Sequence, residues 1–395
     1  MLLDFRRHTK KPSQSRLGEG DSPHFCSADQ PSVGARAKRG TVPGGFVRAS
    51  KVCGWAIVVV ALAASFAPRP AVAATSPETV TAEASSPAAP DSASLPATPI
   101  VESTTPANCH AIRAHDQVWL ISTRGLGCPD GSSAPGLRFW QSNGSGGWTD
   151  SSLAAFLAAD DPAMPTEFYI HGNFEDFDET VQRGVTLYGR LVAQAPDSRP
   201  FRFVIWSWPT DRGKHPLQLT REHAHRADGE AYYLGWLIDR MDRRVQVGLI
   251  GYSLGSRVVT GALHLLGGGQ LIGLSLVLDA KAARPTVRAA LVAAAEDCDS
   301  LSPGRPNGEA IGLVEKILLL NNGCDSVLKR YSHLERCSRA EALGYVGICG
   351  PVDMQKIVQI DVCCAVGKEH EWSRYFYNDS VIDDMLPYLF LEAAK

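Results

Sequence analysis

The chain has 395 residues, of which 44% are hydrophobic and 21% are charged, a composition typical of a globular protein with a sizeable core. Residues 1–51 carry ten Lys or Arg against four Asp or Glu, so the rest of the chain holds about −9 in a total charge of −3. An acidic body without a stripe of Lys and Arg argues against a nucleic-acid partner, because neutralised phosphates supply most non-specific affinity for such partners.

An apolar segment at residues 52–67 has the arrangement of a signal peptide. Arg48 and Lys51 precede its apolar core, and the small residues 71–74 follow it. The core is shorter than the roughly 20 residues that span a bilayer, and its flanks suit signal peptidase. We therefore expect a basic N-terminal segment over residues 1–74 and a protein that is secreted, periplasmic or held in the cell envelope. If cleavage fails, residues 52–67 are expected to anchor the chain in the membrane.

Residues 75–107 consist mainly of Ser, Thr, Ala and Pro, and they have too few large apolar side chains to offset the entropy of ordering. This composition predicts a disordered linker, followed by one folded domain over residues 108–395. The domain holds an even number of cysteines, which is compatible with disulfides in an exported protein. Cys109 and Cys128 could staple the first strand, whereas the pairing of the others stays open. These later cysteines are Cys298, Cys324, Cys337, Cys349, Cys363 and Cys364.

Strand and helix patterns alternate along the folded domain, beginning with a hairpin. We expect strands over residues 117–122, 137–140, 166–170, 201–207, 245–250, 274–278, 316–320 and 356–363. We expect helices over residues 178–194, 224–243, 254–266, 286–295 and 381–394. Such alternation predicts an α/β protein with a mostly parallel sheet and helices on both of its faces.

The five residues from Gly251 to Gly255 match the nucleophile elbow G-x-S-x-G, with Ser253 at the centre. The match alone is weak, but a predicted strand precedes it and a predicted helix follows it, as the motif requires. A sharp strand-to-helix turn needs small residues two positions before and after the nucleophile, and Gly251 and Gly255 supply them. The amide of Leu254, at the start of the helix, is then a candidate oxyanion donor.

A second oxyanion donor is expected on the loop after an earlier strand, where the sequence reads His171-Gly172-Asn173. The candidate is the backbone amide of Asn173. The side chain of His171 has a simpler interpretation as a buried histidine that is hydrogen-bonded to local backbone.

A serine hydroxyl needs a base within hydrogen-bond reach, and the base needs an orienting carboxylate. Three histidines follow Ser253, of which His264 lies within the elbow helix. His370 lies in a predicted loop after the last strand, where it could reach the carboxyl edge of the sheet, and it is our candidate base. His333 is the fallback.

Two aspartates are candidates for the acid. Asp325 follows the predicted strand at residues 316–320 and precedes His370 in the chain. Asp279 follows the predicted strand at residues 274–278, and it remains the alternative.

Other patterns have simpler interpretations. Trp206 and Trp208 end a strand, where core packing is favoured over a pocket-lining role. His223 and His225 form an H-x-H pair, but no further ligands stand at convincing spacing for a metal. Nothing in the sequence requires a metal or another cofactor. Residues 300–312 or 337–351 are the only segments expected to cover a site.

With these motifs placed, residues 115–390 resemble the α/β-hydrolase superfamily and, within it, an uncharacterised bacterial group of predicted serine hydrolases. The resemblance rests on the elbow, on the residues 207–209 that end a strand, and on the segments 322–325 and 367–370. It implies the α/β-hydrolase fold with an eight-stranded sheet. It also implies a triad of Ser253, Asp325 and His370 that needs no cofactor.

The function expected from the sequence is that of a serine hydrolase, secreted or bound to the envelope, which cleaves a carboxylic ester through an acyl-enzyme. The substrate is expected to be a small-molecule or lipid ester. Two alternatives stay open, namely a non-catalytic binding domain that retains the fold and an acyltransferase that passes the acyl group to an alcohol or amine. A short distance between Ser253 and His370 would count against the binding domain.

Overall fold

The computed structural model describes residues 112–131, 134–279, 283–333 and 340–392. The expected basic segment and linker, at residues 1–74 and 75–107, lie outside the described residues, and so does the apolar segment at residues 52–67. Among the residues that are described, no helix combines the length and the apolar character needed to cross a membrane.

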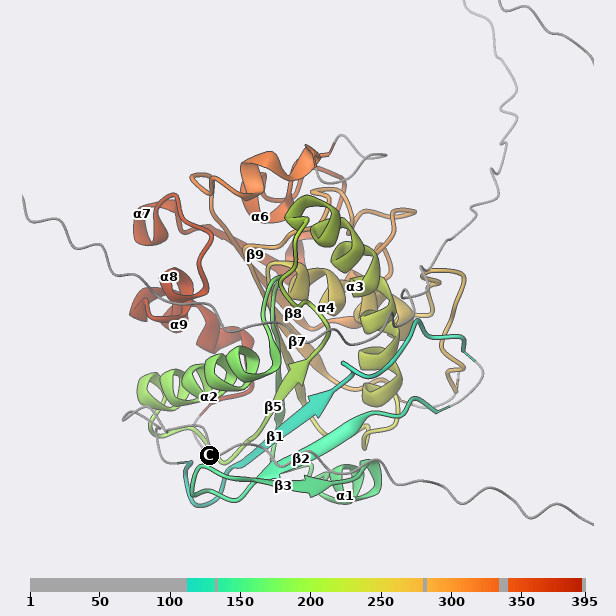
Figure 1. Ribbon diagram of the computed structural model, residues 1–395, viewed down its shortest axis with the longest axis vertical. Coiled ribbons are helices and arrows are strands. Elements are labelled where there is room, and N and C mark those ends of the chain that lie inside the picture. Colours follow the sequence, from blue (N-terminus) through green and yellow to red (C-terminus); the bar gives the residue numbers. More distant parts are fainter. Residues whose placement is uncertain (1–111, 132–133, 280–282, 334–339, 393–395) are drawn as a thin grey trace, which may run out of the picture. The chain divides into compact units, whose positions relative to one another are not determined.

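A nine-stranded sheet forms the centre of the described part of the chain (Figure 1). Its spatial order is β3-β2-β1-β5-β4-β6-β7-β8-β9. Neighbouring strands are parallel except where β2 pairs with β1 and with β3. The strands are β1 Gln117–Ser122, β2 Arg138–Ser142, β3 Trp148–Ser151, β4 Thr166–Ile170, β5 Arg202–Ser207, β6 Val247–Tyr252, β7 Val287–Val292, β8 Lys316–Asn321 and β9 Ile357–Asp361. The α/β prediction is therefore confirmed, while the predicted number of eight strands is wrong by one.

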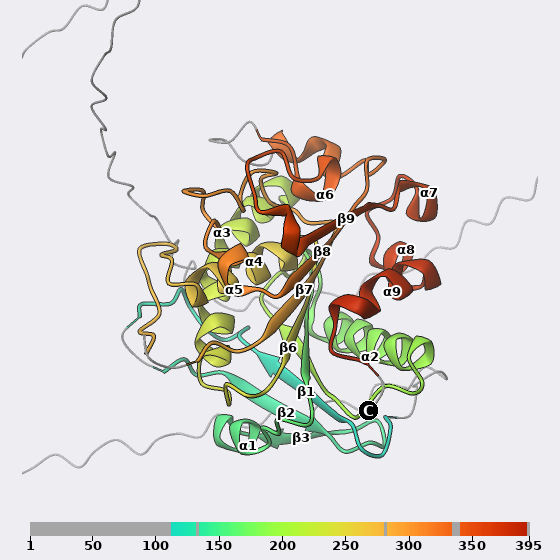
Figure 2. The ribbon, with the colours of Figure 1, turned by 180° about the vertical axis from the view of Figure 1, so that it is seen from behind.

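Helices cover the sheet on both faces (Figures 1 and 2). Helices α2, α8 and α9 lie on one face, and α3 and α4 pack together on the other. The helices are α1 Leu153–Ala158, α2 Phe177–Gln194, α3 Pro216–Ile238, α4 Leu254–Leu266, α5 Ala310–Leu313, α6 Leu343–Val346, α7 Cys363–Val366, α8 Trp372–Phe376 and α9 Asp379–Met385. Short 3₁₀ turns are η1 Leu328–His333, η2 Met354–Lys356 and η3 Leu386–Tyr388.

The central strands are apolar runs because both of their faces are covered. Every residue of β4, β5 and β6 is buried, as expected for parallel strands between two helical layers. Helix α2 can pack closely on the sheet only where its residues are small, and Gly184 of α2 lies against β5. A Cβ atom there would come within 2.6 Å of Ile205. The sheet therefore gives a rigid base from which loops at the carboxyl ends of the strands can present side chains.

Two predicted elements are wrong. Residues 286–295 were expected to be a helix, but they contain strand β7, which is almost wholly buried between the layers. Residues 274–278 were expected to be a strand, yet no strand forms there, and Val277 is 98% exposed. Alanine favours helices and short apolar runs favour strands only as weak tendencies, and tertiary packing overrides both here.

The last elements are shorter than expected. The closing helix, predicted over residues 381–394, is α9, and it gives way to η3 where Pro387 lacks the amide that an α-helix needs. Strand β9 ends at Asp361, and Cys363 begins helix α7 rather than continuing the strand. The predicted first hairpin is present as β1 and β2, whereas β3 and α1 were not expected.

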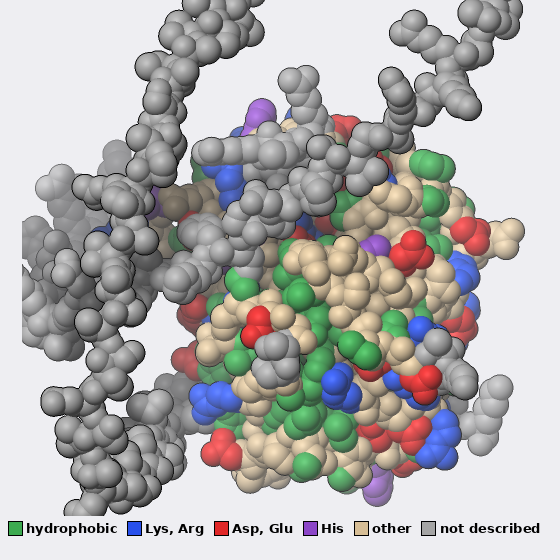
Figure 3. All heavy atoms as spheres, turned by 90° about the vertical axis from the view of Figure 1, so that its right-hand side faces the viewer, with side chains coloured by type: hydrophobic (Ala, Val, Ile, Leu, Met, Phe, Trp, Pro, Cys, Tyr) green, Lys and Arg blue, Asp and Glu red, His purple; other side chains and the backbone are tan. Residues whose placement is uncertain are grey.

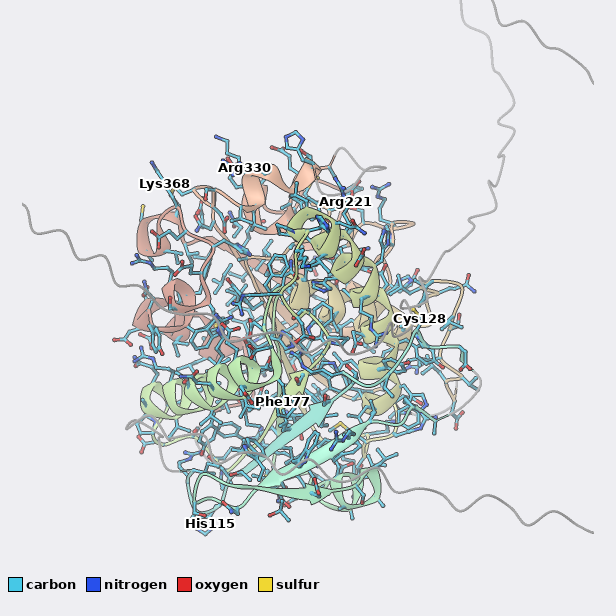
Figure 4. All side chains as sticks on the ribbon, in the orientation of Figure 1. His115, Cys128, Phe177, Arg221, Arg330 and Lys368 are labelled. Atoms are coloured by element: carbon cyan, nitrogen blue, oxygen red, sulfur yellow. A yellow bond between two sulfur atoms is a disulfide. The ribbon has the colours of Figure 1, made fainter. Side chains whose placement is uncertain are left out.

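Disulfides join Cys298 to Cys349 and Cys324 to Cys363. Cys128, labelled in Figure 4, is also disulfide-bonded, and its expected partner Cys109 lies outside the described residues. Disulfides are typical of proteins in oxidising compartments.

Charges of both signs are mixed on the face shown in Figure 3, where Lys and Arg side chains alternate with Asp and Glu and no stripe of one sign appears. Apolar side chains are scattered between them.

Candidate functional site

Ser253 occupies a sharp turn between β6 and α4. Its backbone has φ 54° and ψ −119°, a positive-φ conformation that non-glycine residues rarely adopt. The flanking glycines are needed for steric reasons. A Cβ atom on Gly255 would lie 2.1 Å from the carbonyl oxygen of Ile170, and one on Gly251 would lie 2.6 Å from Cα of Ser256. The strand-turn-helix context expected around Ser253 is therefore present.

The strained turn is held by strand β7 and the loop after it. The amide of Ser253 donates to the carbonyl oxygen of Val292 over 2.9 Å, and its own carbonyl accepts from the amide of Ala295 over 3.1 Å. Ser253 is buried, with 5% of its surface exposed. Backbone pairing on both sides thus fixes the hydroxyl above the carboxyl edge of the sheet.

His370 lies beside this hydroxyl. Its Nε2 atom is 2.9 Å from Oγ of Ser253, and its Nδ1 atom is 2.6 Å from Oδ2 of Asp325. An ionised carboxylate can only accept, so Nδ1 carries the proton and Nε2 is left to accept from the serine hydroxyl. The structure therefore brings together the three residues nominated from the sequence, in the order hydroxyl, imidazole, carboxylate.

Asp325 is fully buried, and its carboxylate accepts hydrogen bonds from His370, from Tyr375 and from two backbone amides. Oδ1 accepts from the amides of Val327 and Leu328, each over 2.9 Å. Burial alone would raise the pKa of Asp325, but the hydrogen bond and charge of His370, together with these amides, outweigh it. The pKa consequently lies below its ordinary value, and the carboxylate stays ionised beside the imidazole.

The loops that carry His370 and Asp325 are tied to each other. The amide of Ser326 donates to the carbonyl oxygen of Lys368 over 2.9 Å, and Nδ2 of Asn322 donates to that of Gly367 over 2.9 Å. The disulfide between Cys324 and Cys363 joins the same two segments. These links hold the imidazole and the carboxylate as one unit.

The loop after β4 lies directly against the nucleophile. A Cβ atom on Gly172 would lie 3.1 Å from Cβ of Ser253. The next residue is Asn173, whose backbone amide is the candidate oxyanion donor. On the other side, Leu254 is the first residue of α4, and its amide has no acceptor within the helix. Leu254 thus adjoins Ser253 in the chain, and Asn173 follows a glycine that packs against Ser253.

The side chain of Asn173 is held by helix α3. Its Nδ2 atom donates to Thr220 over 3.0 Å, and its Oδ1 atom lies 2.6 Å from Nδ1 of His223. Oδ1 also accepts from the amide of Phe174, which has φ 59°. Burial lowers the pKa of His223, so a neutral imidazole donates from Nδ1. Of the two histidines in the H-x-H pair, His223 is buried and holds the side chain of Asn173. His225 is exposed on the same helix.

His171 is a buried histidine that bonds to local backbone, as expected. Its Nδ1 atom lies 2.8 Å from the carbonyl oxygen of Gly172, and its Nε2 atom accepts from the amide of Trp208 over 3.1 Å. Burial and the charge of Arg124 hold its pKa well below the ordinary value. Trp206 and Trp208 are both fully buried, which confirms core packing.

The alternatives named from the sequence lie elsewhere. Asp279 is exposed and follows a segment that forms no strand, so the reason for nominating it is gone. His264 lies 3.2 Å from the carbonyl oxygen of Gln270, and its Nδ1 atom accepts from the amide of Glu309. His333 is exposed at the end of η1.

Two tyrosines contact the site: Tyr252, whose place next to Ser253 predicts that it shapes the pocket, and Tyr375, which the sequence did not single out. The hydroxyl of Tyr252 donates to the carbonyl oxygen of His370 over 2.8 Å, and its ring stacks on the imidazole with centroids 5.6 Å apart. The hydroxyl of Tyr375 contacts Oδ2 of Asp325 over 3.0 Å. Tyr252 stands next to the serine in the motif, which was a usable signal. For Tyr375, the only signal in the sequence was its nearness to His370 in the chain.

The segments expected to cover a site are anchored beside it. Within residues 300–312, Asn307 donates to the buried carboxylate of Glu296 over 3.0 Å. Within residues 337–351, of which 337–339 lie outside the described residues, Gly344 lies against the loop after β7. A Cβ atom there would come within 2.2 Å of the amide of Ala294.

Basic side chains lie at the end of the molecule where the loops of the site gather. Figure 4 labels Arg221 of α3, Arg330 of η1 and Lys368 of the loop before His370, all in the upper part of the view. A hydrogen bond from Arg221 to the carbonyl oxygen of His333 connects α3 to η1 there. Among the described residues, no group of three or more His, Cys, Asp or Glu side chains could hold a metal ion.

The sequence matches no protein-family model. It also has no significant match among curated proteins.

Proposed function

We propose that the chain is a serine hydrolase that cleaves a carboxylic ester, and that its finer fold class is that of the α/β-hydrolases. The observation that carries this proposal is the 2.9 Å contact between Oγ of Ser253 and Nε2 of His370 at a strained strand-to-helix turn. The contact lies within hydrogen-bond reach, which counts against a non-catalytic binding domain.

The strand order supports the finer fold class. Strand β5 lies between β1 and β4, and the elbow strand β6 comes next, near the middle of the sheet. The nucleophile therefore follows a central strand, at the carboxyl edge where open α/β sheets place their ligands.

In the proposed reaction, Nε2 of His370 takes the proton of Ser253 while Oγ attacks the ester carbonyl carbon. The tetrahedral oxyanion accepts hydrogen bonds from the backbone amides of Leu254 and Asn173. Asp325 keeps the imidazole in the required tautomer and stabilises its protonated form. The intermediate then expels the alcohol, which takes the proton from His370, and leaves Ser253 acylated.

Hydrolysis of the acyl-enzyme reverses the roles. His370 takes a proton from a water molecule, which attacks the acyl carbonyl carbon. As the second intermediate breaks its bond to Oγ of Ser253, His370 returns the proton to that oxygen and the carboxylic acid is released. These steps need no metal or other cofactor, and the proposed substrate is a small-molecule or lipid ester.

The test uses the full chain with p-nitrophenyl acetate and butyrate and a fluorophosphonate probe. The expected result is that Ser253→Ala abolishes turnover and probe uptake, whereas Ser275→Ala, at an exposed serine, leaves both unchanged. Full activity and full labelling in Ser253→Ala would overturn the proposal. Adding an alcohol acceptor and analysing the products separates hydrolysis from acyl transfer.

A further inference from the structure

Tyr375 belongs to helix α8 and contacts the acid of the candidate site. It is fully buried, and its hydroxyl is 3.0 Å from Oδ2 of Asp325. This is the same carboxylate oxygen that accepts from Nδ1 of His370 over 2.6 Å. One oxygen atom therefore receives two hydrogen bonds, one from the imidazole and one from a phenol.

A second contact fixes the direction of the phenol's proton. Nδ2 of Asn322 lies 3.1 Å from the hydroxyl of Tyr375, and an amide nitrogen can only donate. The hydroxyl accepts from Asn322, so its single proton points to Asp325. Burial and the charge of Asp325 raise the pKa of Tyr375 well above its ordinary value. The phenol is thus protonated at neutral pH and can donate to the carboxylate.

A donor at this oxygen has an electrostatic effect as well as a geometric one. A hydrogen bond to a carboxylate disperses its negative charge and weakens it as an acceptor for other donors. The charge of Asp325 stabilises the protonated form of His370. The phenol therefore competes with the imidazole for the same negative charge.

We propose that Tyr375 is a positioning residue that sets how strongly Asp325 supports His370. This inference rests on the proposed function, because it concerns the same hydroxyl, imidazole and carboxylate. The phenol limits the stabilisation of the imidazolium, and so it holds the base active at lower pH than Asp325 alone would allow.

Tyr252 provides a matched comparison on the same histidine. Its hydroxyl donates to the backbone carbonyl of His370 over 2.8 Å, so its single proton is directed to that carbonyl and not to the carboxylate of Asp325. Loss of this hydroxyl loosens the histidine loop, but it leaves the charge of Asp325 as it was. The two tyrosines therefore separate a geometric role from an electrostatic one.

The experiment measures kcat/KM against pH for Tyr375→Phe, Tyr252→Phe and Tyr377→Phe in the full chain. Tyr377 is 57% exposed and serves as the control for loss of a phenolic hydroxyl. We expect Tyr375→Phe to move the acid limb of the profile upward by about one pH unit, because the carboxylate then supports the imidazolium more strongly. We expect Tyr252→Phe to lower kcat without moving the acid limb, and Tyr377→Phe to change neither.

An acid limb that stays in place in Tyr375→Phe, or that moves equally in Tyr252→Phe, would overturn the proposal. A fold control is the near-UV circular dichroism of each variant. A second readout is the far-downfield proton NMR resonance of Nδ1–H of His370, which does not depend on turnover. We expect that resonance to shift in Tyr375→Phe and to stay in Tyr377→Phe.

These readouts separate the two proposals. If wild-type protein shows neither turnover nor labelling of Ser253, the proposed function fails, while the NMR comparison still tests the coupling between Tyr375 and His370. If turnover is present and neither the acid limb nor the NMR resonance responds to Tyr375→Phe, only the inference about Tyr375 fails.

Discussion

Cys324 is bonded to Cys363, and this disulfide joins the loop that carries Asp325 to the segment that leads to His370. The cross-link spans 39 residues of chain. It lies immediately before Asp325 in sequence, so it constrains the acid and the base of the candidate site at the same time.

Removing this disulfide should therefore lower activity even under conditions in which the variant is fully folded. The double variant Cys324→Ser, Cys363→Ser should lose about 4 kcal/mol of unfolding free energy by the loop-entropy relation. It should also show a lower kcat at temperatures where it is fully folded, because the imidazole and the carboxylate lose a shared restraint. Urea unfolding and ester turnover measure the two effects.

The matched control is the double variant Cys298→Ser, Cys349→Ser, whose disulfide joins neither the segment that carries Asp325 nor the one that carries His370. It should lose stability and keep the kcat of its folded fraction. Equal losses of kcat in the two double variants would contradict the prediction.

Gly255 should be intolerant of any side chain. A Cβ atom at this position would lie 2.1 Å from a backbone oxygen of Ile170, and backbone atoms cannot move aside as a flexible side chain can. We expect Gly255→Ala to lower the unfolding free energy by about 3 kcal/mol or more. Gly312→Ala is the control, since a Cβ atom there meets nothing within 4 Å. A near-neutral Gly255→Ala in thermal or urea unfolding would contradict this view of the turn.

Replacing His223 should slow the proposed reaction, although this residue lies far from Ser253 in the sequence. Its Nδ1 atom holds Oδ1 of Asn173 at 2.6 Å, and so it steadies the loop that offers the second oxyanion donor. We expect His223→Ala to lower kcat about tenfold with a smaller change in KM, because oxyanion donors act mainly in the transition state. His225→Ala, at an exposed position on the same helix, should leave kcat unchanged. Equal kinetics of the two variants would remove His223 from this role.

Buried glutamates should make stability fall as the pH rises through neutrality. Burial raises the pKa of Glu296 from 4.5 to about 7, although Thr260, Ser300 and Asn307 all donate to its carboxylate. The folded state then binds more protons than the unfolded state between these values. The associated stability is fully present below pH 4.5 and is lost as the pH rises through about 7.

For Glu296 the shift corresponds to about 3 kcal/mol as an upper bound. We expect Glu296→Gln to flatten the fall in unfolding free energy between pH 5 and pH 8, as measured in urea. Glu315→Gln, at an exposed glutamate, should keep the wild-type slope. Asp325 has the opposite sign, since its lowered pKa gives stability that is lost as the pH falls. An unchanged slope in Glu296→Gln would show that its carboxylate does not titrate in this range.

The sequence could predict those parts of the fold that local rules decide. The turn at Ser253 was predictable because only glycine fits at Gly251 and Gly255, and because an apolar run precedes the turn and a helical pattern follows it. Strand β7 was not, because its alanines favour a helix and only burial between two layers makes them a strand. The strand predicted over residues 274–278 was wrong for the opposite reason. An apolar run suggests a buried strand, but whether it is buried depends on tertiary contacts that the sequence does not show.

The candidate site shows the same division. Ser253, Asp325 and His370 could be nominated from residue type and from their places after strands. The partners of Asp325 and Asn173 could not, because Tyr375 and His223 reach them through contacts 50 residues apart in the chain. The pairing of Cys324 with Cys363 was likewise unreadable, since it depends on where two distant loops meet.

The contact between Ser253 and His370 joins positions 117 residues apart, and His370 arrives on a loop that follows the edge strand β9. Contacts of such long range form only after the intervening chain has been ordered. During synthesis from the N-terminus, the elbow strand and helix emerge well before the histidine. Ser253 is therefore synthesised before the base that activates it. Covalent labelling of Ser253 would report that β8, β9 and α8 have docked.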